Sequence, residues 1–416
     1  MLPTRITLVH LFLLLLFVIS CIDGLVKSDV REHILTQFEI DEKVRISDAR
    51  ARGEQLDKRF VSSTPFITAN GFRNLCYPHV VDYNYTLPSS LQCNISTAML
   101  KAVPDGACVY IASACFNKVV QFHISLIPKS FSLVVHDGDQ SIPDGQTDYQ
   151  SGWLQQFETL PQLTRLHAQG KLIALHAQNL WWKKWWAANR PTWLHCLPIG
   201  LPMRKYLIGS NLTVYLEVIR ESLATGVPLL GTHSQQLTKR PLLLVAFTPK
   251  SYAPDRGKAL LSFFGKKKSF YTKNSFTHEG WLRAIVAHRF TLCPFGHGLD
   301  THRLWEVLLL GGIPVVRRSS ITSCIDDSDN VILFPRRGRR DSDAANSTDV
   351  VKVERGSIPI VVVNSWSEVT EVFLERKWRQ LRHRVGGWDY SRILMEHWEA
   401  RIMGPERQNR SHRDQL

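Results

Sequence analysis

Two charged residues that lie three positions apart, Arg303 and Glu306, interrupt an otherwise apolar stretch of the sequence. This spacing places both side chains on one face of a helix. An unpaired carboxylate is costly in apolar surroundings, so Glu306 needs hydrogen-bond donors. The donors could be the hydroxyls of a ribose, which acidic residues bind in dinucleotide-binding folds, or Arg303 itself in a structural ion pair. The spacing alone leaves both interpretations open.

The residues around this pair predict the elements that would position it. Residues 288–318 have the pattern of an apolar strand, a glycine-containing turn, a helix and a second apolar strand. Asp300 and Thr301 can cap the helix, and two glycines can end it. A helix that joins two strands in this way forms a βαβ unit, from which parallel sheets are built. Backbone N–H groups after Gly298, together with Arg303, could hold a phosphate at the helix N-terminus.

The segment CPFGHGLDTHRLWEVLLLGGIPVV, residues 293–316, resembles the donor-binding signature of the exostosin-like glycosyltransferases. In that family, a loop rich in proline and glycine precedes an Arg…Glu helix and an Ile-Pro-Val strand. The resemblance covers roughly residues 120–403 and is specific at 288–316. It implies an α/β fold of the GT-B type, in which two Rossmann-like domains face a cleft, and a nucleotide sugar as donor. The donor-binding residues that it implies are Gly296, Gly298, Arg303 and Glu306, with His297 and Asp300 as further candidates.

A second basic pair, Lys250 and Arg256, follows the apolar run 241–247. A continuous apolar run of this length predicts a central strand of a parallel sheet. Its loop would bring both cations to the carboxyl end of the strand, where a positive charge can neutralise a leaving diphosphate. Solvated loop charges explain the two residues equally well.

In the first half of the chain, His136, Asp137 and Asp139 follow the predicted strand 131–135. They could lie on the acceptor side, with Asp137 or Asp139 as a catalytic base, or the aspartates could stabilise a turn. Asp-X-Asp is also the metal-binding signature of a different glycosyltransferase fold, but this loop has turn composition and the nucleotide signature lies far downstream. Arg204 would lie near the interdomain cleft by analogy with the family. We expect no metal site and no cofactor beyond the nucleotide-sugar cosubstrate, because a helix dipole and arginines can stabilise the leaving group.

Other segments give predictions of secondary structure alone. Residues 119–124 are predicted as a strand, and residues 366–380 as a helix with Ser367 as a candidate cap. Residues 211–225 predict an apolar helix, and residues 331–334 a further strand.

A chain of 416 residues, of which 44% are hydrophobic, is long enough for two folded domains. The formal charge of +14 favours anionic partners. Since no nucleic-acid-binding motif accompanies the charge, we expect nucleotide phosphates or glycans rather than nucleic acid. The predicted divisions are a signal peptide or type II signal-anchor at 1–24, a stem at 25–64, an N-terminal acceptor-side Rossmann-like domain at 65–238, a C-terminal nucleotide-sugar-binding domain at 239–403 and a polar tail at 404–416.

The beginning of the chain predicts entry into the secretory pathway. Arg5 precedes an apolar run at 6–22 that is long for a signal-peptide core and near the lower limit for a spanning helix. A cleaved signal and an uncleaved anchor in the membrane therefore both fit. The Golgi residence that the resemblance to the exostosin-like family implies favours a type II protein of the Golgi membrane, with a secreted protein as the alternative.

Glycosylation sequons and cysteines agree with a lumenal body. Seven cysteines follow the leader, and Cys93, Cys108 and Cys115 are close enough in sequence for at least one disulfide in an oxidising compartment. The odd count predicts one free thiol. Asn-X-Ser/Thr sequons begin at Asn84, Asn94, Asn211, Asn346 and Asn409.

The sequence thus predicts a glycosyltransferase that moves a sugar from a nucleotide sugar, most simply a UDP-sugar, to a glycan or glycoprotein acceptor. A catalytically inactive lumenal relative that binds glycans is the first alternative, and failed nucleotide binding would favour it. A basic protein that binds nucleic acid or a membrane surface is the second, and the leader and sequons count against nucleic acid.

Overall fold

All the residues that the computed structural model describes belong to one compact unit, Asp57–Leu416, and none to the other, Met1–Leu56. The predicted leader and tail therefore lie outside the described residues, as do Lys250, Arg204 and the predicted strand at 331–334. The predicted domain boundaries stay predictions. The described residues are 67–83, 92–139, 141–143, 159–181, 191–202, 212–224, 240–248, 253–263, 271–273, 276–322, 358–382, 388 and 390–403.

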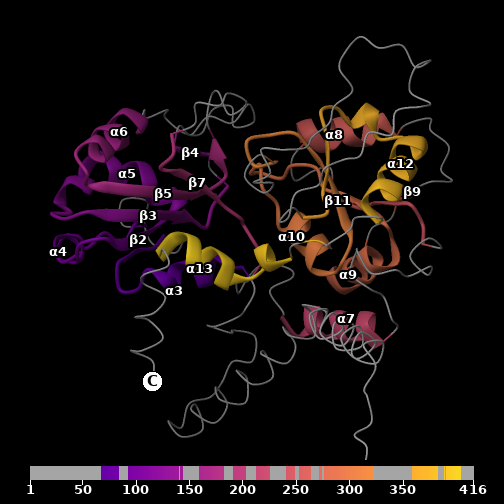
Figure 1. Cartoon of the computed structure of the whole chain (residues 1–416), viewed down its shortest axis with the longest axis horizontal. Helices are drawn as coiled ribbons and strands as arrows, with labels where there is room; N and C mark the ends of the chain where they lie inside the picture. Colours follow the sequence, from indigo (N-terminus) through magenta and orange to yellow (C-terminus); the bar gives the residue numbers. More distant parts are fainter. Residues whose placement is uncertain are drawn as a thin grey trace, which may run out of the picture. The chain divides into compact units, whose positions relative to one another are not determined.

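The first sheet consists of five parallel strands in the order β1-β2-β3-β5-β7 (Figure 1). Every residue of the central strand β3 is buried, as expected for a strand covered on both faces. The register pairs Val135 with Ala177 and Gln178 with Leu197, so the carboxyl ends of neighbouring strands meet at one edge. The strands are β1 (Val80–Val81), β2 (Ala107–Ala112), β3 (Phe131–His136), β5 (Leu172–Gln178) and β7 (Leu194–Leu197).

Short helices connect these strands, and one of them corrects a prediction. Residues 116–122 form a helix, α5, where the β-branched run at 119–124 predicted a strand. Its buried residues Phe116, Val119 and Val120 recur at helical spacing, and this periodicity outweighs the strand propensity of the valines. The connecting elements are α3 (Ala69–Leu75), α4 (Thr97–Lys101), η1 (Ser113–Cys115), α5 (Phe116–Phe122), η2 (Ile124–Leu126), α6 (Leu160–Ala168) and the parallel pair β4 (Ile142–Pro143) and β6 (Leu180–Trp181).

The second sheet is also parallel and has the order β12-β11-β10-β8-β9. Its first strand in sequence, β8, pairs with β9 on one side and with β10 on the other, so the direction of winding reverses between β8 and β10. Open α/β sheets bind ligands at such a reversal, outside the carboxyl ends of the strands. The strands are β8 (Leu243–Val245), β9 (Tyr271–Lys273), β10 (Phe290–Leu292), β11 (Ile313–Arg317) and β12 (Val361–Val363).

The predicted βαβ unit and central strand are confirmed in this sheet. β10 and β11 are parallel neighbours, with α10 between them in sequence. The predicted helix at 211–225 is also confirmed, as α7. The helices of this part of the chain are α7 (Leu212–Ala224), α8 (Ala253–Ser262), α9 (His278–Ala287), α10 (His302–Leu309) and α12 (Glu371–Arg382).

The helix predicted at 366–380 begins later and has a different cap. A 3-10 turn, η7 (Trp366–Glu368), precedes α12. Ser365 caps this turn in a capping box: Glu368 Oε1 accepts the N–H of Ser365 at 2.9 Å. The prediction of Ser367 was wrong because the box requires an acidic or amide side chain three residues after the cap, which Ser365 has and Ser367 lacks.

The C-terminal segment returns to the first sheet. It consists of η8 (Ser391–Ile393) and α13 (Met395–Met403). The N–H of Ile67 donates to the carbonyl of Ile393 at 3.3 Å. A Cβ added at Gly71 of α3 would lie only 2.7 Å from Met395 Sδ, so α3 and α13 approach closely there. The last helix therefore packs beside residues that begin the first sheet, although it lies far away in sequence.

Two disulfides, Cys76–Cys108 and Cys93–Cys115, connect the segments around β1 and β2. Cys196 is also disulfide-bonded, and Cys293 is free and buried. The predicted bridge among the clustered cysteines is confirmed. Disulfides of this kind indicate an extracellular or lumenal protein. In the part of the chain that the structure describes, no helix has the length and apolar character that a membrane crossing needs.

The Cys76–Cys108 disulfide closes a long loop, with a sequence separation of 32. In the chain-entropy model a loop of this size stabilises the fold by about 3–4 kcal/mol. We expect the double variant Cys76→Ala/Cys108→Ala to lose about that much stability in urea unfolding. An unchanged unfolding midpoint would show that the bond is absent from the folded protein.

Acid should destabilise the first sheet through His176. Its ring stacks on that of His195, with centroids 4.8 Å apart. Burial, followed by the charges of His195 and Arg401, lowers the pKa of His176 to about 3. The unfolded chain, with an ordinary histidine pKa, takes up a proton below about pH 6.5 that the folded chain does not, so stability is lost as pH falls.

The variant His176→Phe should remove this dependence while keeping an aromatic ring against His195. Between pH 7 and pH 5 the wild type should lose about 2 kcal/mol more stability than the variant. Urea unfolding at the two pH values measures the difference. Equal losses would show that His176 takes up its proton without unfolding.

Candidate functional site

Two arginines lie at the point where the winding of the second sheet reverses. Arg303 Nη1 donates to the carbonyl of Ala246, just beyond β8. Arg256 Nη1 donates to the carbonyl of Thr248 at 3.0 Å, and its Nε donates to the carbonyl of Phe295, beyond β10, also at 3.0 Å. The structure therefore brings together these two residues, which the sequence predicted on separate grounds, at the carboxyl ends of β8 and β10.

The positive charges of these arginines are poorly solvated. Arg256 is 9% exposed, and burial together with the charge of Arg303 lowers its pKa to about 10. Burial also lowers the pKa of Arg303, whose guanidinium lies 4.1 Å from the ring centroid of Trp281 and 5.9 Å from that of Phe247. A bound anion would relieve the repulsion between the two like charges.

The glycine loop after β10 borders this site. Gly296 lies beside Arg256, because an added Cβ would be 3.5 Å from Arg256 Nη2. His297 is exposed, and no described residue forms a hydrogen bond or an ion pair with it. A Cβ at Gly298 would lie 2.5 Å from Asn179 Nδ2, so only glycine allows this approach to the first sheet. The first part of the loop thus faces an arginine, and its last glycine contacts Asn179.

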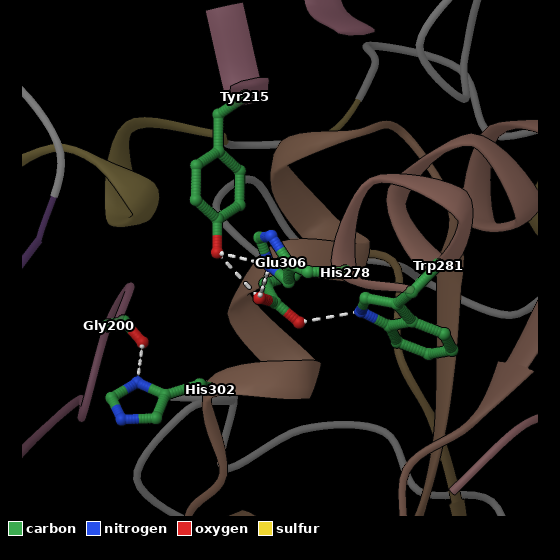
Figure 2. A network of polar contacts seen from close by, with 6 residues as sticks. All are labelled: Gly200, Tyr215, His278, Trp281, His302 and Glu306. Carbon is green, nitrogen blue, oxygen red and sulfur yellow. Dashed lines mark hydrogen bonds and ion pairs between the residues drawn. The ribbon is translucent and has the colours of Figure 1, made fainter. Parts of the chain in front are cut away.

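The Glu306 carboxylate is buried and held by three internal donors (Figure 2). Its Oε1 accepts the hydroxyl of Tyr215 at 2.6 Å and lies 3.3 Å from His278 Nε2. Its Oε2 accepts Trp281 Nε1–H at 2.8 Å. Burial alone would raise the pKa of Glu306, but hydrogen bonds from His278, Tyr215 and Trp281 outweigh burial and leave the pKa below its usual value. The network therefore favours the ionised carboxylate.

The simple ion pair between Arg303 and Glu306 does not form in the described structure. Arg303 contacts the face of the Trp281 ring, while the indole N–H of the same ring donates to Glu306. A carboxylate has about four acceptor positions, of which the network fills three. The ribose-binding role predicted for Glu306 stays a prediction, and the network leaves one acceptor position of the carboxylate unfilled.

None of the three donors to Glu306 was predicted from the sequence: Tyr215, His278 and Trp281. His278 and Trp281 lie on α9 at a spacing of three, which places them on one face and could have indicated a shared partner. Tyr215 lies on α7, 91 residues before Glu306, and nothing in its local sequence indicates that contact.

A second network joins the start of α10 to the first sheet. The N–H of Asp300 donates to Asn179 Oδ1 at 2.8 Å, and Asp300 Oδ2 accepts the N–H of Ile199 at 2.7 Å. His302 Nδ1 lies 2.7 Å from the carbonyl of Gly200, to which it donates (Figure 2). These contacts connect Asn179, Ile199 and Gly200 with Asp300 and His302.

Asp300 has a different local role from the predicted side-chain cap. Thr301 takes the N-cap position of α10 without a side-chain cap hydrogen bond. Asp300 Oδ1 instead accepts the N–H of Thr301 at 2.8 Å, and both carboxylate oxygens lie 3.0 Å from Trp305 Nε1. Burial raises the pKa of Asp300 to about 7 despite these donors. Its predicted role in donor binding stays a prediction.

His136, Asp137 and Asp139 lie at the carboxyl edge of the first sheet. His136 is fully buried: its Nε2 donates to the carbonyl of Pro198 at 2.9 Å, and its Nδ1 accepts the N–H of Asp137 at 2.8 Å. Both ring nitrogens therefore have structural partners. Asp137 adopts a left-handed conformation with φ of 67°, and Asp139 is exposed.

The same turn is connected to the glycine loop of the second sheet through Asn179. The side chain of Asn179 donates to the carbonyl of Gly138 at 3.1 Å and also lies against Gly298. The predicted acceptor-side and donor-side residues are thus separated by one asparagine. Among the described residues, no group of three His, Cys, Asp or Glu side chains is arranged to hold a metal ion.

Comparisons of this chain with protein-family models and with curated proteins give no match. The resemblance to exostosin-like glycosyltransferases therefore stays a prediction that depends on the residues of the signature.

The hydrogen bond between Tyr215 and Glu306 should contribute measurably to stability. Tyr215→Phe removes one donor from a buried carboxylate, for which we expect a loss of about 1–3 kcal/mol. In combination with Glu306→Gln, the loss should be smaller than the sum of the single losses by at least about 0.5 kcal/mol. Urea unfolding of the four proteins gives this coupling energy.

Tyr271→Phe is the matched control for this cycle. It also removes a tyrosine hydroxyl, which donates to the carbonyl of Phe263 at 3.4 Å. Its effect should add to that of Glu306→Gln within about 0.5 kcal/mol. If Tyr215→Phe were equally additive, Glu306 would not depend on Tyr215.

Proposed function

We propose that this protein is a glycosyltransferase that acts in the secretory pathway and takes its sugar from a nucleotide sugar. The observation that carries the proposal is the pair Arg256 and Arg303 at the reversal between β8 and β10, where like charges are held with little water. This is the position at which open α/β sheets bind nucleotides. The two sheets would then be the two Rossmann-like domains of a GT-B enzyme.

The proposed reaction transfers negative charge to the leaving group. The acceptor hydroxyl oxygen bonds to the anomeric carbon, the bond from that carbon to the diphosphate breaks, and the nucleoside diphosphate leaves. Arg256 and Arg303, fixed by backbone carbonyls, stabilise the charge that develops on the diphosphate. Glu306 accepts a ribose hydroxyl at its remaining acceptor position, and His297 and the amides around Gly296 complete the donor site. Lys250, predicted for the same site, lies outside the described residues.

The acceptor would bind at the carboxyl edge of the first sheet. Asp139 is the better candidate for the base that takes the acceptor proton, because it is exposed and no described residue is bonded to its carboxylate. His136 is less suited, since both of its ring nitrogens have partners. We propose that the N-terminal segment directs the protein to the Golgi, as a type II anchor or as a cleaved signal.

One observation favours a second function, that of a catalytically inactive relative that binds glycans. Three internal donors already hold Glu306, so its charge is stabilised without a ribose. In such a relative, Glu306 would serve only to connect α7, α9 and α10. Nucleotide binding distinguishes the two functions.

The test is thermal unfolding of the full chain, purified in detergent from a eukaryotic host, with UDP, GDP, ADP or CMP and with or without Mn²⁺. A ligand at about 100 times its Kd stabilises the folded state by about 2.7 kcal/mol, which corresponds to a rise of a few degrees. We expect one nucleotide to raise the melting temperature of the wild type. The rise should be absent in Arg256→Gln and Arg303→Gln.

Arg283→Gln is the control for the loss of a positive charge. Arg283 is exposed on α9, where it pairs with Glu279 at 2.8 Å and with Glu221. This variant should keep the full nucleotide shift. Because each variant is compared with itself in the absence of nucleotide, a change in its intrinsic stability does not affect the result. A folded wild type that responds to none of the nucleotides would contradict the transferase and favour the glycan-binding relative.

A further inference from the structure

Phe295, the residue before Gly296, is held on both sides of its backbone by the first turn of α8. Its N–H donates to Asp255 Oδ2 at 3.0 Å, and its carbonyl accepts Arg256 Nε–H at 3.0 Å. Two consecutive residues of one helix therefore fix the conformation of the glycine loop where it begins.

A third arginine, Arg317, contacts the same assembly from the neighbouring strand. It is the last residue of β11, and its Nε lies 2.8 Å from Asp255 Oδ1. Its guanidinium carbon lies 4.7 Å from the centroid of the Phe295 ring. The Arg317 side chain is 25% exposed, whereas Asp255 is fully buried. A buried carboxylate and an aromatic face thus hold a guanidinium that still reaches solvent.

The sheet order places Arg317 opposite the other two arginines. β10 lies between β11 and β8 in the sheet. Arg256 and Arg303 donate to carbonyls that follow β8, while Arg317 ends β11. The loop after β10 is therefore flanked by cations on both sides.

The turn after β11, close to Arg317 in sequence, contains a buried hydroxyl. Ser319 is buried, and its hydroxyl has no hydrogen-bond partner within the described structure. A buried hydroxyl of this kind normally bonds to protein, water or ligand. Ser319 lies two residues beyond Arg317 in sequence. Its unpaired hydroxyl is an observation independent of the arginine contacts.

We propose that Arg317 binds the second phosphate of a nucleoside diphosphate whose first phosphate lies against Arg256 and Arg303, and that Asp255 positions Arg317 for this contact. The inference rests on the proposed function and adds a residue that determines specificity. A guanidinium can contact two anionic groups at once, so Arg317 keeps its ion pair with Asp255 while it contacts phosphate. The site then selects diphosphate donors over nucleoside monophosphate donors.

The test compares nucleoside diphosphates with monophosphates on the full chain, using UDP and UMP, GDP and GMP, and ADP and AMP in isothermal titration calorimetry. We expect Arg317→Gln to weaken diphosphate binding about 10- to 100-fold, the effect of one charge-assisted hydrogen bond. Monophosphate binding should change less than about 3-fold. Arg317→Lys keeps a cation beside Asp255 and should give an intermediate diphosphate affinity, even if Arg317→Gln folds poorly.

Arg318→Gln is the matched control, because it removes the same charge from the next residue. Arg318 Nε donates to Asn364 Oδ1 at 3.1 Å, on the β12 side. The diphosphate affinity of the Arg318→Gln variant should stay within about 3-fold of that of the wild type. Equal losses for diphosphate and monophosphate in Arg317→Gln, or equal losses in Arg317→Gln and Arg318→Gln, would overturn the role of Arg317 and leave the proposed function standing. A wild type that binds no nucleotide would overturn the proposed function and this inference with it.

Discussion

The buried Glu306 carboxylate accepts hydrogen bonds from Tyr215 on α7, from Trp281 on α9 and from His278 at the start of α9. A charge removed from water is tolerated only where donors surround it. The helices α7 and α9 must therefore both pack against α10. The same contacts also position Arg303, because the Trp281 ring that donates to Glu306 packs against the Arg303 guanidinium. Glu306 and Arg303 are thus coupled through an indole ring instead of through each other.

Asn179 has a comparable position between the two sheets. It adopts a left-handed conformation directly after β5, which turns its side chain toward both Gly138 and Gly298. Its amide oxygen accepts the N–H of Asp300, and its amide nitrogen donates to the carbonyl of Gly138. A change at the turn after β3 can therefore reach the glycine loop through a single side chain. In a transferase this contact would connect the acceptor edge with the donor loop.

The balance of charge at the second sheet is what favours a nucleotide ligand over a purely structural site. A structural cluster would be expected to pair each arginine with a carboxylate. Asp255 instead forms an ion pair with Arg317. Arg256 and Arg303 donate to backbone carbonyls, which do not neutralise the positive charges. The pKa of Arg256 is lowered by burial and by Arg303, so the protein keeps two cations that repel each other at the carboxyl ends of β8 and β10. The main observation in favour of a structural site is that three internal donors already stabilise the Glu306 carboxylate.

The sequence by itself determined the local elements. Apolar runs between turn residues predicted β8, β10 and β11, and the strand-loop-helix-strand order predicted their parallel pairing, because these features depend on neighbouring residues. The predictions from the sequence were wrong at α5, where burial at helical spacing outweighed the strand propensity of the β-branched residues. They were also wrong at the cap of η7. Only the tertiary structure decided which partners the charges found. Tyr215 lies 91 residues from Glu306, and Asp300 lies 101 residues from Ile199, and no local pattern encodes contacts that arise when separate elements pack together. The sequence could identify Glu306 as a buried carboxylate that needs donors, but which donors it received depended on the packing of α7 and α9 against α10.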